Sequence, residues 1–125
     1  MKFYKEILMD HYQNPRNRGH LEKPVFSTVQ YNPSCGDSIS FEGIIEDGII
    51  KALAFEGKGC VISLATASML TEFFVGKKIE EVLGFQDSKI SEIIGMPLGP
   101  MRIKCALLAL MALKEGILEY KAKHA

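Results

Sequence analysis

The fold is decided by one continuous stretch, SISFEGIIEDGIIKALAF, which runs from Ser38 to Phe55. Its first five residues alternate polar and apolar side chains, as a strand with one buried face requires. Asp47-Gly48 is a strong two-residue turn signal, and the segment that follows from Ile49 is rich in β-branched and aromatic residues. The stretch therefore predicts a β-hairpin.

The register of this hairpin bears on the chemistry at its open end. If Glu46 faces Ile49 across the turn, the same ladder sets Cys35 opposite Cys60, and Asp37 shares the face of Cys35. That register sends the apolar residues of the two strands to opposite faces, and a bulge that shifts the pairing by about one residue repairs this. In either register the two cysteines lie at the same end of the hairpin.

The segments around the hairpin predict one further strand and several helices. In chain order they are an amphipathic helix within residues 1–12 that Asn14-Pro15 ends, a strand from Phe26 to Tyr31, a helix from Val61 to Val75 that Gly76 stops, short helical pieces at Glu80–Leu83 and Ser88–Ile94, and a last helix that begins at Pro100. We expect an α+β fold, with a small antiparallel sheet of three strands and helices packed on one face.

Length and composition narrow the class of protein. The 125 residues suit a single domain, 1–125. Lys and Arg balance Asp and Glu at 15 each, without a basic run longer than two, which argues against nucleic acid as a partner. The sequence has no apolar stretch long enough to span a membrane, and charges stand near the start where a signal peptide needs apolar residues. We therefore expect a cytoplasmic protein with no membrane partner.

Three cysteines stand where loops meet regular elements. An odd number in a reducing compartment leaves thiolates free for metal or chemistry. Cys60 precedes a helix, whose N-terminus favours a thiolate, and Cys105 lies in the second turn of the last helix beside its buried stripe. Together with Cys35 and the carboxylate of Asp37 they make a four-coordinate shell suited to zinc or to part of an iron–sulfur cluster.

Each of these residues also has a purely structural interpretation. Any one cysteine taken alone is equally consistent with a small buried hydrophobe, and Asp37 alone with the cap of a turn. The histidines, His11, His20 and His124, have no metal-ligand spacing and are expected on the solvated surface. Arg16 either stabilises its own loop, folds back to the site, or contacts a partner.

Four motifs then resemble a known family. In order they are Asn14-Pro15-Arg16-Asn17, Cys35-Gly36-Asp37, Gly57-Lys58-Gly59-Cys60 and Arg102-Ile103-Lys104-Cys105. With the helices between them, the chain from about Phe3 to about Leu118 resembles the IscU/SufU/NifU-N-terminal family of iron–sulfur cluster assembly scaffold proteins. The resemblance implies a SufE/NifU-like fold. It also implies a scaffold that accepts sulfur from a pyridoxal-phosphate cysteine desulfurase, binds iron, and holds a transient [2Fe-2S] cluster for transfer to apoproteins.

The resemblance also implies the roles of individual residues. Cys35, Asp37, Cys60 and Cys105 are the ligand set, and zinc can occupy the same shell. Cys35, on a glycine-flanked loop, is the candidate persulfide acceptor, with Cys105 as the alternative. Aspartate is a hard ligand among sulfurs, so a cluster held through Asp37 is more easily lost than one held by four thiolates.

Two departures from the family pattern concern the mechanism. Lys104 stands where the IscU branch has a histidine, and Arg-Ile-Lys-Cys resembles the SufU branch, yet the SufU insertion ahead of the final helix is missing. Lys104, with Arg102 in the same motif, either places positive charge near an anionic cluster or persulfide or projects into solvent. The Leu-Pro-Pro-Val-Lys stretch that the IscU branch offers to an Hsp70 chaperone is Leu98-Gly99-Pro100-Met101-Arg102 here. Use of a chaperone, or of an iron or electron donor, is therefore an open question.

Three functional hypotheses follow. The first is an assembly scaffold, a carrier without turnover of its own. The second is a SufU-like zinc-dependent sulfurtransferase, and the third is a protein in which zinc only holds the loops together. We favour the scaffold because the SufU insertion is missing.

Overall fold

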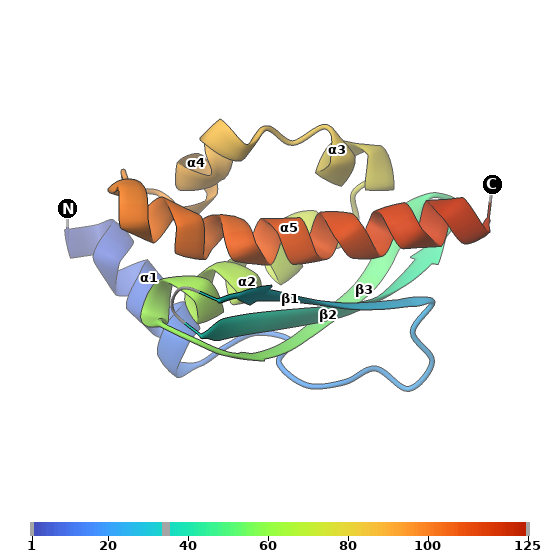
Figure 1. Cartoon of the computed structure of the whole chain (residues 1–125), viewed down its shortest axis with the longest axis horizontal. Coiled ribbons are helices and arrows are strands. Elements are labelled where there is room, and N and C mark those ends of the chain that lie inside the picture. Colours follow the sequence, from blue (N-terminus) through green and yellow to red (C-terminus); the bar gives the residue numbers. More distant parts are fainter. Residues whose placement is uncertain (1, 34–35, 125) are drawn as a thin grey trace.

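The computed structural model describes residues 2–33 and 36–124 and the side chains from Lys5 onward. Its elements follow the predicted order (Figure 1). They are α1 (Lys2–Gln13), β1 (Phe26–Asn32), β2 (Asp37–Glu46), β3 (Ile49–Lys58), α2 (Val61–Phe74), α3 (Ile79–Leu83), the 3-10 turn η1 (Asp87–Lys89), α4 (Ile90–Ile94) and α5 (Pro100–Lys123). The predicted α+β class with a three-stranded antiparallel sheet is confirmed.

The hairpin forms at the predicted turn. Asp47 and Gly48 both have positive φ, 53° and 75°, the conformation that a tight two-residue hairpin turn requires and that an Asp-Gly pair adopts at low cost. Glu46 pairs with Ile49 as predicted. A bulge between Ile44 and Ile45 then moves every later partner by one residue.

The unshifted register is therefore wrong beyond the bulge. Phe41 pairs with Phe55, and Ser38 pairs with Lys58. The physical reason is burial, since the shift places Ile39, Phe41 and Phe55 on one face, where each is at most 1% exposed. The bulge thus puts the apolar sides of the two strands into the same core.

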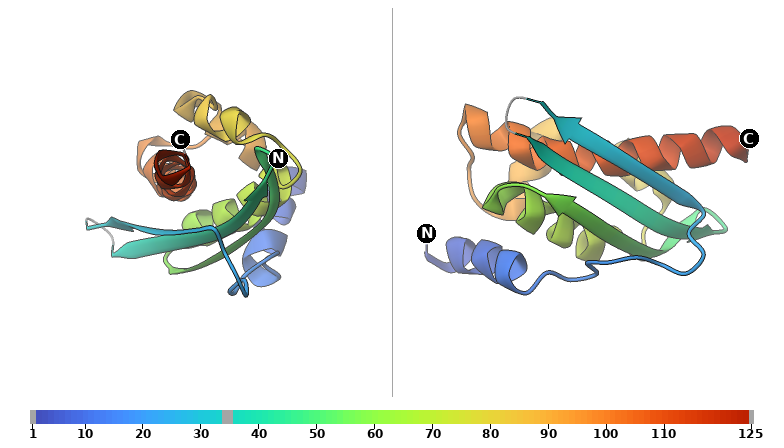
Figure 2. Two further views of the ribbon diagram at one scale, coloured as in Figure 1. Left: turned by 90° about the vertical axis from the view of Figure 1, so that its right-hand side faces the viewer. Right: turned by 60° about the horizontal axis from the view of Figure 1, so that its bottom comes forward.

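Helices cover one face of this sheet, as predicted. In Figure 2, α5 runs along β1 and β2 while α2 packs against β3 on the same side of the sheet, and α1 packs against α2. Gly116 permits the close contact of α5 with β1, because a Cβ there would lie 2.5 Å from a ring carbon of Phe26. No helix in the described part of the chain is long and apolar enough to cross a membrane.

The segment between α1 and β1 forms hydrogen bonds with the edge strand β3 and with a residue on the outer face of the sheet. Gly19 donates its N–H to the carbonyl of Phe55, and Phe55 donates to the carbonyl of Asn17, at 2.8 and 3.0 Å. Farther along, Glu42 on the outer face accepts from the backbone N–H of Leu21 at 2.8 Å. This pairing protects the exposed edge of β3 and fixes the position of α1.

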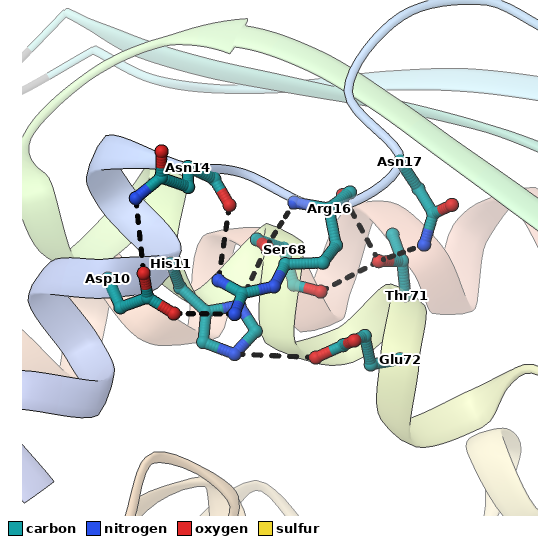
Figure 3. Close-up of polar contacts among 8 residues, drawn as sticks. All are labelled: Asp10, His11, Asn14, Arg16, Asn17, Ser68, Thr71 and Glu72. Carbon is teal, nitrogen blue, oxygen red and sulfur yellow. Dashed lines mark hydrogen bonds and ion pairs between the residues drawn. The ribbon is translucent and has the colours of Figure 1, made fainter.

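A polar network, buried at His11 and Ser68 and solvent-accessible at Arg16 and Asp10, joins α1 and this segment to α2 (Figure 3). Arg16 pairs with Asp10 and donates to the carbonyl of Asn14, so of its three predicted roles the loop-stabilising one is observed. His11 is only 7% exposed, which makes its predicted place on the solvated surface wrong. Its Nδ1 lies 2.7 Å from the hydroxyl oxygen of Ser68. This hydrogen bond replaces the one that water makes to an exposed imidazole, so the ring can be buried.

Candidate metal centre

Three of the four predicted ligands converge at the end of the sheet near the start of α2. Asp37 opens β2, Cys60 immediately precedes α2, and Cys105 lies in the second turn of α5. One carboxylate oxygen and the two Sγ atoms all lie within 4.8 Å of one another. The fourth, Cys35, lies outside the described residues. A β-strand, a helix N-terminus and a second helix thus bring these three side chains to one point.

Cys60 is the N-cap of α2. Its backbone is extended, with φ −75° and ψ 171°, and its Sγ accepts the backbone N–H of Ser63 at 3.5 Å. The first amides of a helix lack partners within the helix and carry its positive dipole end, so they stabilise a thiolate at this position. Cys60 is exposed, which removes the alternative that it is a buried hydrophobe.

Asp37 is buried at 5% exposure, and its surroundings are built for a carboxylate. The Ser63 hydroxyl donates to Oδ2 at 2.7 Å. A Cβ on Gly59 would lie 2.8 Å from the carboxylate carbon and about 3 Å from both oxygens, so only glycine leaves room for the group. Burying a carboxylate is costly without a partner for its charge, and a bound cation would supply one.

Cys105 is half-buried and packs against the hydrophobic core. Its backbone carbonyl lies 3.4 Å from Oγ of Ser63, which connects the first turns of α5 to the first turn of α2. Its partial burial fits both the predicted ligand and the small hydrophobe.

A hollow of about 530 Å³ borders the two thiols. Its walls come from α1, the start of α2, the segment after α4 and the start of α5, and they are Lys5, Leu8, Met9, Cys60, Val61, Ile62, Met96, Met101, Arg102 and Cys105. Of the two basic residues singled out in the sequence, Arg102 lines this hollow. Lys104 is exposed and lines a separate hollow of about 240 Å³ with Tyr31 and Met111.

The sequence did not predict two contributions to the site, the hydrogen bonds of Ser63 and the space that Gly59 leaves beside Asp37. Ser63 contacts the three predicted ligands that the structure describes, through hydrogen bonds to Asp37 and Cys60 and through the carbonyl of Cys105. The available signal was spacing, because an N-cap residue meets the backbone N–H of the third helical residue, which here is Ser63.

The model of the NifU-like N-terminal domain matches residues 3–125. The chain belongs to this family. The IscU scaffold protein of Haemophilus influenzae is 38% identical over 125 residues, which cover 97% of this chain and 98% of that relative. The zinc-dependent sulfurtransferase SufU of Bacillus subtilis is 37% identical and covers 91% of this chain and 88% of its own length. That alignment extends over 131 positions, so SufU has residues within the span that this chain lacks.

Solved structures of NifU-like domains share the fold. The N-terminal NifU-like protein of Brucella abortus superposes with a TM-score of 0.80 over 96% of this chain and 95% of its own, at 20% identity. The putative SUF-system scaffold protein of Fervidobacterium islandicum gives 0.76 over 90% and 94%, at 27% identity.

The donor set of this NifU-like domain fits a four-coordinate metal. Around a tetrahedral ion with metal–sulfur bonds of about 2.3 Å, neighbouring ligand atoms are about 3.8 Å apart. With a metal–oxygen bond of about 2.0 Å the sulfur–oxygen separation is about 3.5 Å, so the separations of up to 4.8 Å between the Asp37, Cys60 and Cys105 donors need to contract by at most about 1.3 Å. Two sulfurs and one carboxylate oxygen suit zinc and iron better than calcium or magnesium, which prefer oxygen alone.

Proposed function

We propose that this NifU-like domain is an iron–sulfur cluster assembly scaffold that accepts sulfur from a cysteine desulfurase, binds iron and holds a [2Fe-2S] cluster for transfer to apoproteins. The observation that carries the proposal is the convergence of Asp37, Cys60 and Cys105 within 4.8 Å. Homology supports it, because relatives that align with nearly the whole chain are named as such scaffolds. Cys35 completes the proposed ligand set.

Sulfur enters through thiol chemistry. A cysteine thiolate of the scaffold attacks the outer sulfur of a persulfide on the desulfurase, the sulfur–sulfur bond breaks, and its electron pair leaves with the desulfurase thiolate. We assign Cys35 as the first acceptor and Cys105 as the alternative. The hollow beside Cys60 and Cys105 supports the alternative acceptor, because the Cys105 thiol borders an open space.

The cargo must also be released. Asp37 is the weakest of the proposed ligands for iron bound to sulfide, because its hard oxygen suits that iron less well than a thiolate does. A cluster held in part by Asp37 is therefore labile, as a carrier requires.

A zinc-dependent sulfurtransferase is the second candidate. Lys104 stands directly before Cys105, the arrangement of the SufU branch, and SufU of B. subtilis is nearly as similar to the chain as IscU. In that function zinc occupies the Asp37, Cys60 and Cys105 shell and only sulfur leaves. The missing residues relative to SufU favour the scaffold.

Reconstitution separates the functions. The purified chain is incubated under anaerobic conditions with ferrous iron, cysteine and a cognate desulfurase, before and after removal of zinc. A visible [2Fe-2S] chromophore that passes to an apoferredoxin supports the scaffold. Zinc-dependent stimulation of the desulfurase without a chromophore supports the sulfurtransferase. If the chain is inert in both assays and unfolds on chelation, zinc has a structural role alone.

A further inference from the structure

The side chain of Ser63 lies between the three predicted ligands that the structure describes. It is fully buried, with an exposure of 0%. Its hydroxyl oxygen lies 2.7 Å from Oδ2 of Asp37, 3.4 Å from the carbonyl oxygen of Cys105 and 3.5 Å from Sγ of Cys60. A hydroxyl has only one hydrogen to donate, and the shortest contact, to Asp37, takes it.

This hydrogen bond occupies one oxygen of Asp37, and the other, Oδ1, accepts no hydrogen bond from the part of the chain that the structure describes. Oδ2 accepts the Ser63 hydroxyl, while the absence of a side chain on Gly59 leaves space around the rest of the carboxylate. Oδ1 is therefore the oxygen that Asp37 can offer to an ion beside the two thiols while Oδ2 keeps its bond to Ser63. A carboxylate held in this way binds through one oxygen, because rotation to bring both oxygens to an ion breaks the bond to Ser63.

We propose that Ser63 is a positioning residue that holds Asp37 as a one-oxygen ligand. The inference rests on the proposed function, since it takes Asp37 as a ligand. Partners that orient a ligating carboxylate or imidazole raise metal affinity by about 10- to 100-fold. Ser63 also donates its backbone N–H to Cys60, but that bond survives any side-chain replacement, so the hydroxyl can be tested alone.

The test is a double-mutant cycle in Co²⁺ affinity, measured by titrating the visible absorption of the zinc-free protein with cobalt. We expect Ser63→Ala to lower Co²⁺ affinity by about 10-fold or more in the native chain. In an Asp37→Ala background the same replacement should change the affinity by less than about threefold, because its target is gone. An equal loss in both backgrounds, or no loss in either, overturns the proposal.

Thr66→Val is the matched control. Thr66 lies one turn farther along α2, is also fully buried, and has no hydrogen-bond partner for its Oγ1 in the described part of the chain. Replacing its hydroxyl with a methyl group of similar size should leave Co²⁺ affinity unchanged. A loss as large as that of Ser63→Ala would mean that any buried hydroxyl of α2 affects the site, which contradicts a specific role for Ser63.

The cycle separates this inference from the proposed function. If Asp37→Ala does not weaken Co²⁺ binding, the ligand set itself is wrong. If Asp37→Ala weakens binding and Ser63→Ala does not, only the role of Ser63 is wrong. Should Ser63→Ala fail to fold, a crystal structure of the native zinc-loaded chain decides: one Asp37 oxygen on zinc and the other on Ser63 is the expected result, and both oxygens on zinc would refute it.

Discussion

Gly59→Ala tests whether the metal centre depends on the space around Asp37, and it replaces none of the proposed ligands. The added Cβ would lie 2.8 Å from the carboxylate carbon of Asp37, whereas carbon atoms in contact are normally at least about 3.5 Å apart. Asp37 is buried and bonded to Ser63, so it cannot swing into solvent and must move by about 0.7 Å or more. Metal–ligand distances tolerate only about 0.2 Å. We expect Zn²⁺ affinity to fall by about 10- to 100-fold, or about 1.4 to 2.7 kcal/mol.

The assay is competition for Zn²⁺ between the apo chain and a chromophoric chelator, with circular dichroism to show that the variant is folded. Gly99→Ala is the control, because Gly99 is the N-cap of α5, has an ordinary φ of −72°, and has no atom within 4 Å of an added Cβ. If Gly59→Ala binds zinc as tightly as Gly99→Ala and the native chain, the Asp37 carboxylate does not bind zinc from its position beside Gly59.

Three further predictions follow from the same structure. Cys60→Ser should keep the helix cap, since serine is a good N-cap residue, and therefore keep thermal stability while zinc affinity drops; an unfolded variant would show that the sulfur matters for folding alone. Lys104→Ala should leave zinc affinity within about twofold, because Lys104 lines a different hollow from the thiols; a larger loss in the chelator competition would place its charge at the centre. Burial holds the pKa of His11 below its ordinary value, so its contribution to stability is present above the unfolded-state pKa and is lost as pH falls toward the folded-state pKa. The urea midpoint of the native chain should decline between about pH 7.5 and 5.5, and that of His11→Gln should decline less. The hydrogen bond to Glu42 raises the pKa of His20, and His20 is present in both proteins, so its effect cancels in the comparison. An equal decline in the two proteins would contradict the role of His11.

Local patterns in the sequence predicted the helices, the strands and the hairpin. The features that they did not predict depend on contacts between residues far apart in the chain. Alternation and Asp47-Gly48 located the hairpin because both depend only on neighbouring residues. The bulge at Ile44 and Ile45 depends on which face the helices cover, so its presence was anticipated but its position was not. His11 was misplaced because its partner Ser68 is 57 residues away in the chain.

In the metal centre, too, the sequence predicted the residues that lie in recognisable motifs and did not predict those that act through three-dimensional contacts. The motifs and the family resemblance led to Asp37, Cys60 and Cys105, and the helix N-terminus explained why Cys60 suits a thiolate. Ser63 and Gly59 act through shape and a single hydrogen bond in three dimensions. Neither residue type indicates a metal site, so their contribution becomes visible only in the three-dimensional structure.

The most direct test of the metal centre is X-ray absorption at the zinc edge of the zinc-loaded native chain and of Cys60→Ser. We expect sulfur neighbours at about 2.3 Å together with an oxygen at about 2.0 Å in the native chain, and one fewer sulfur in the variant. A shell of nitrogen and oxygen alone, or an identical sulfur count in both proteins, would contradict a centre built from these thiols.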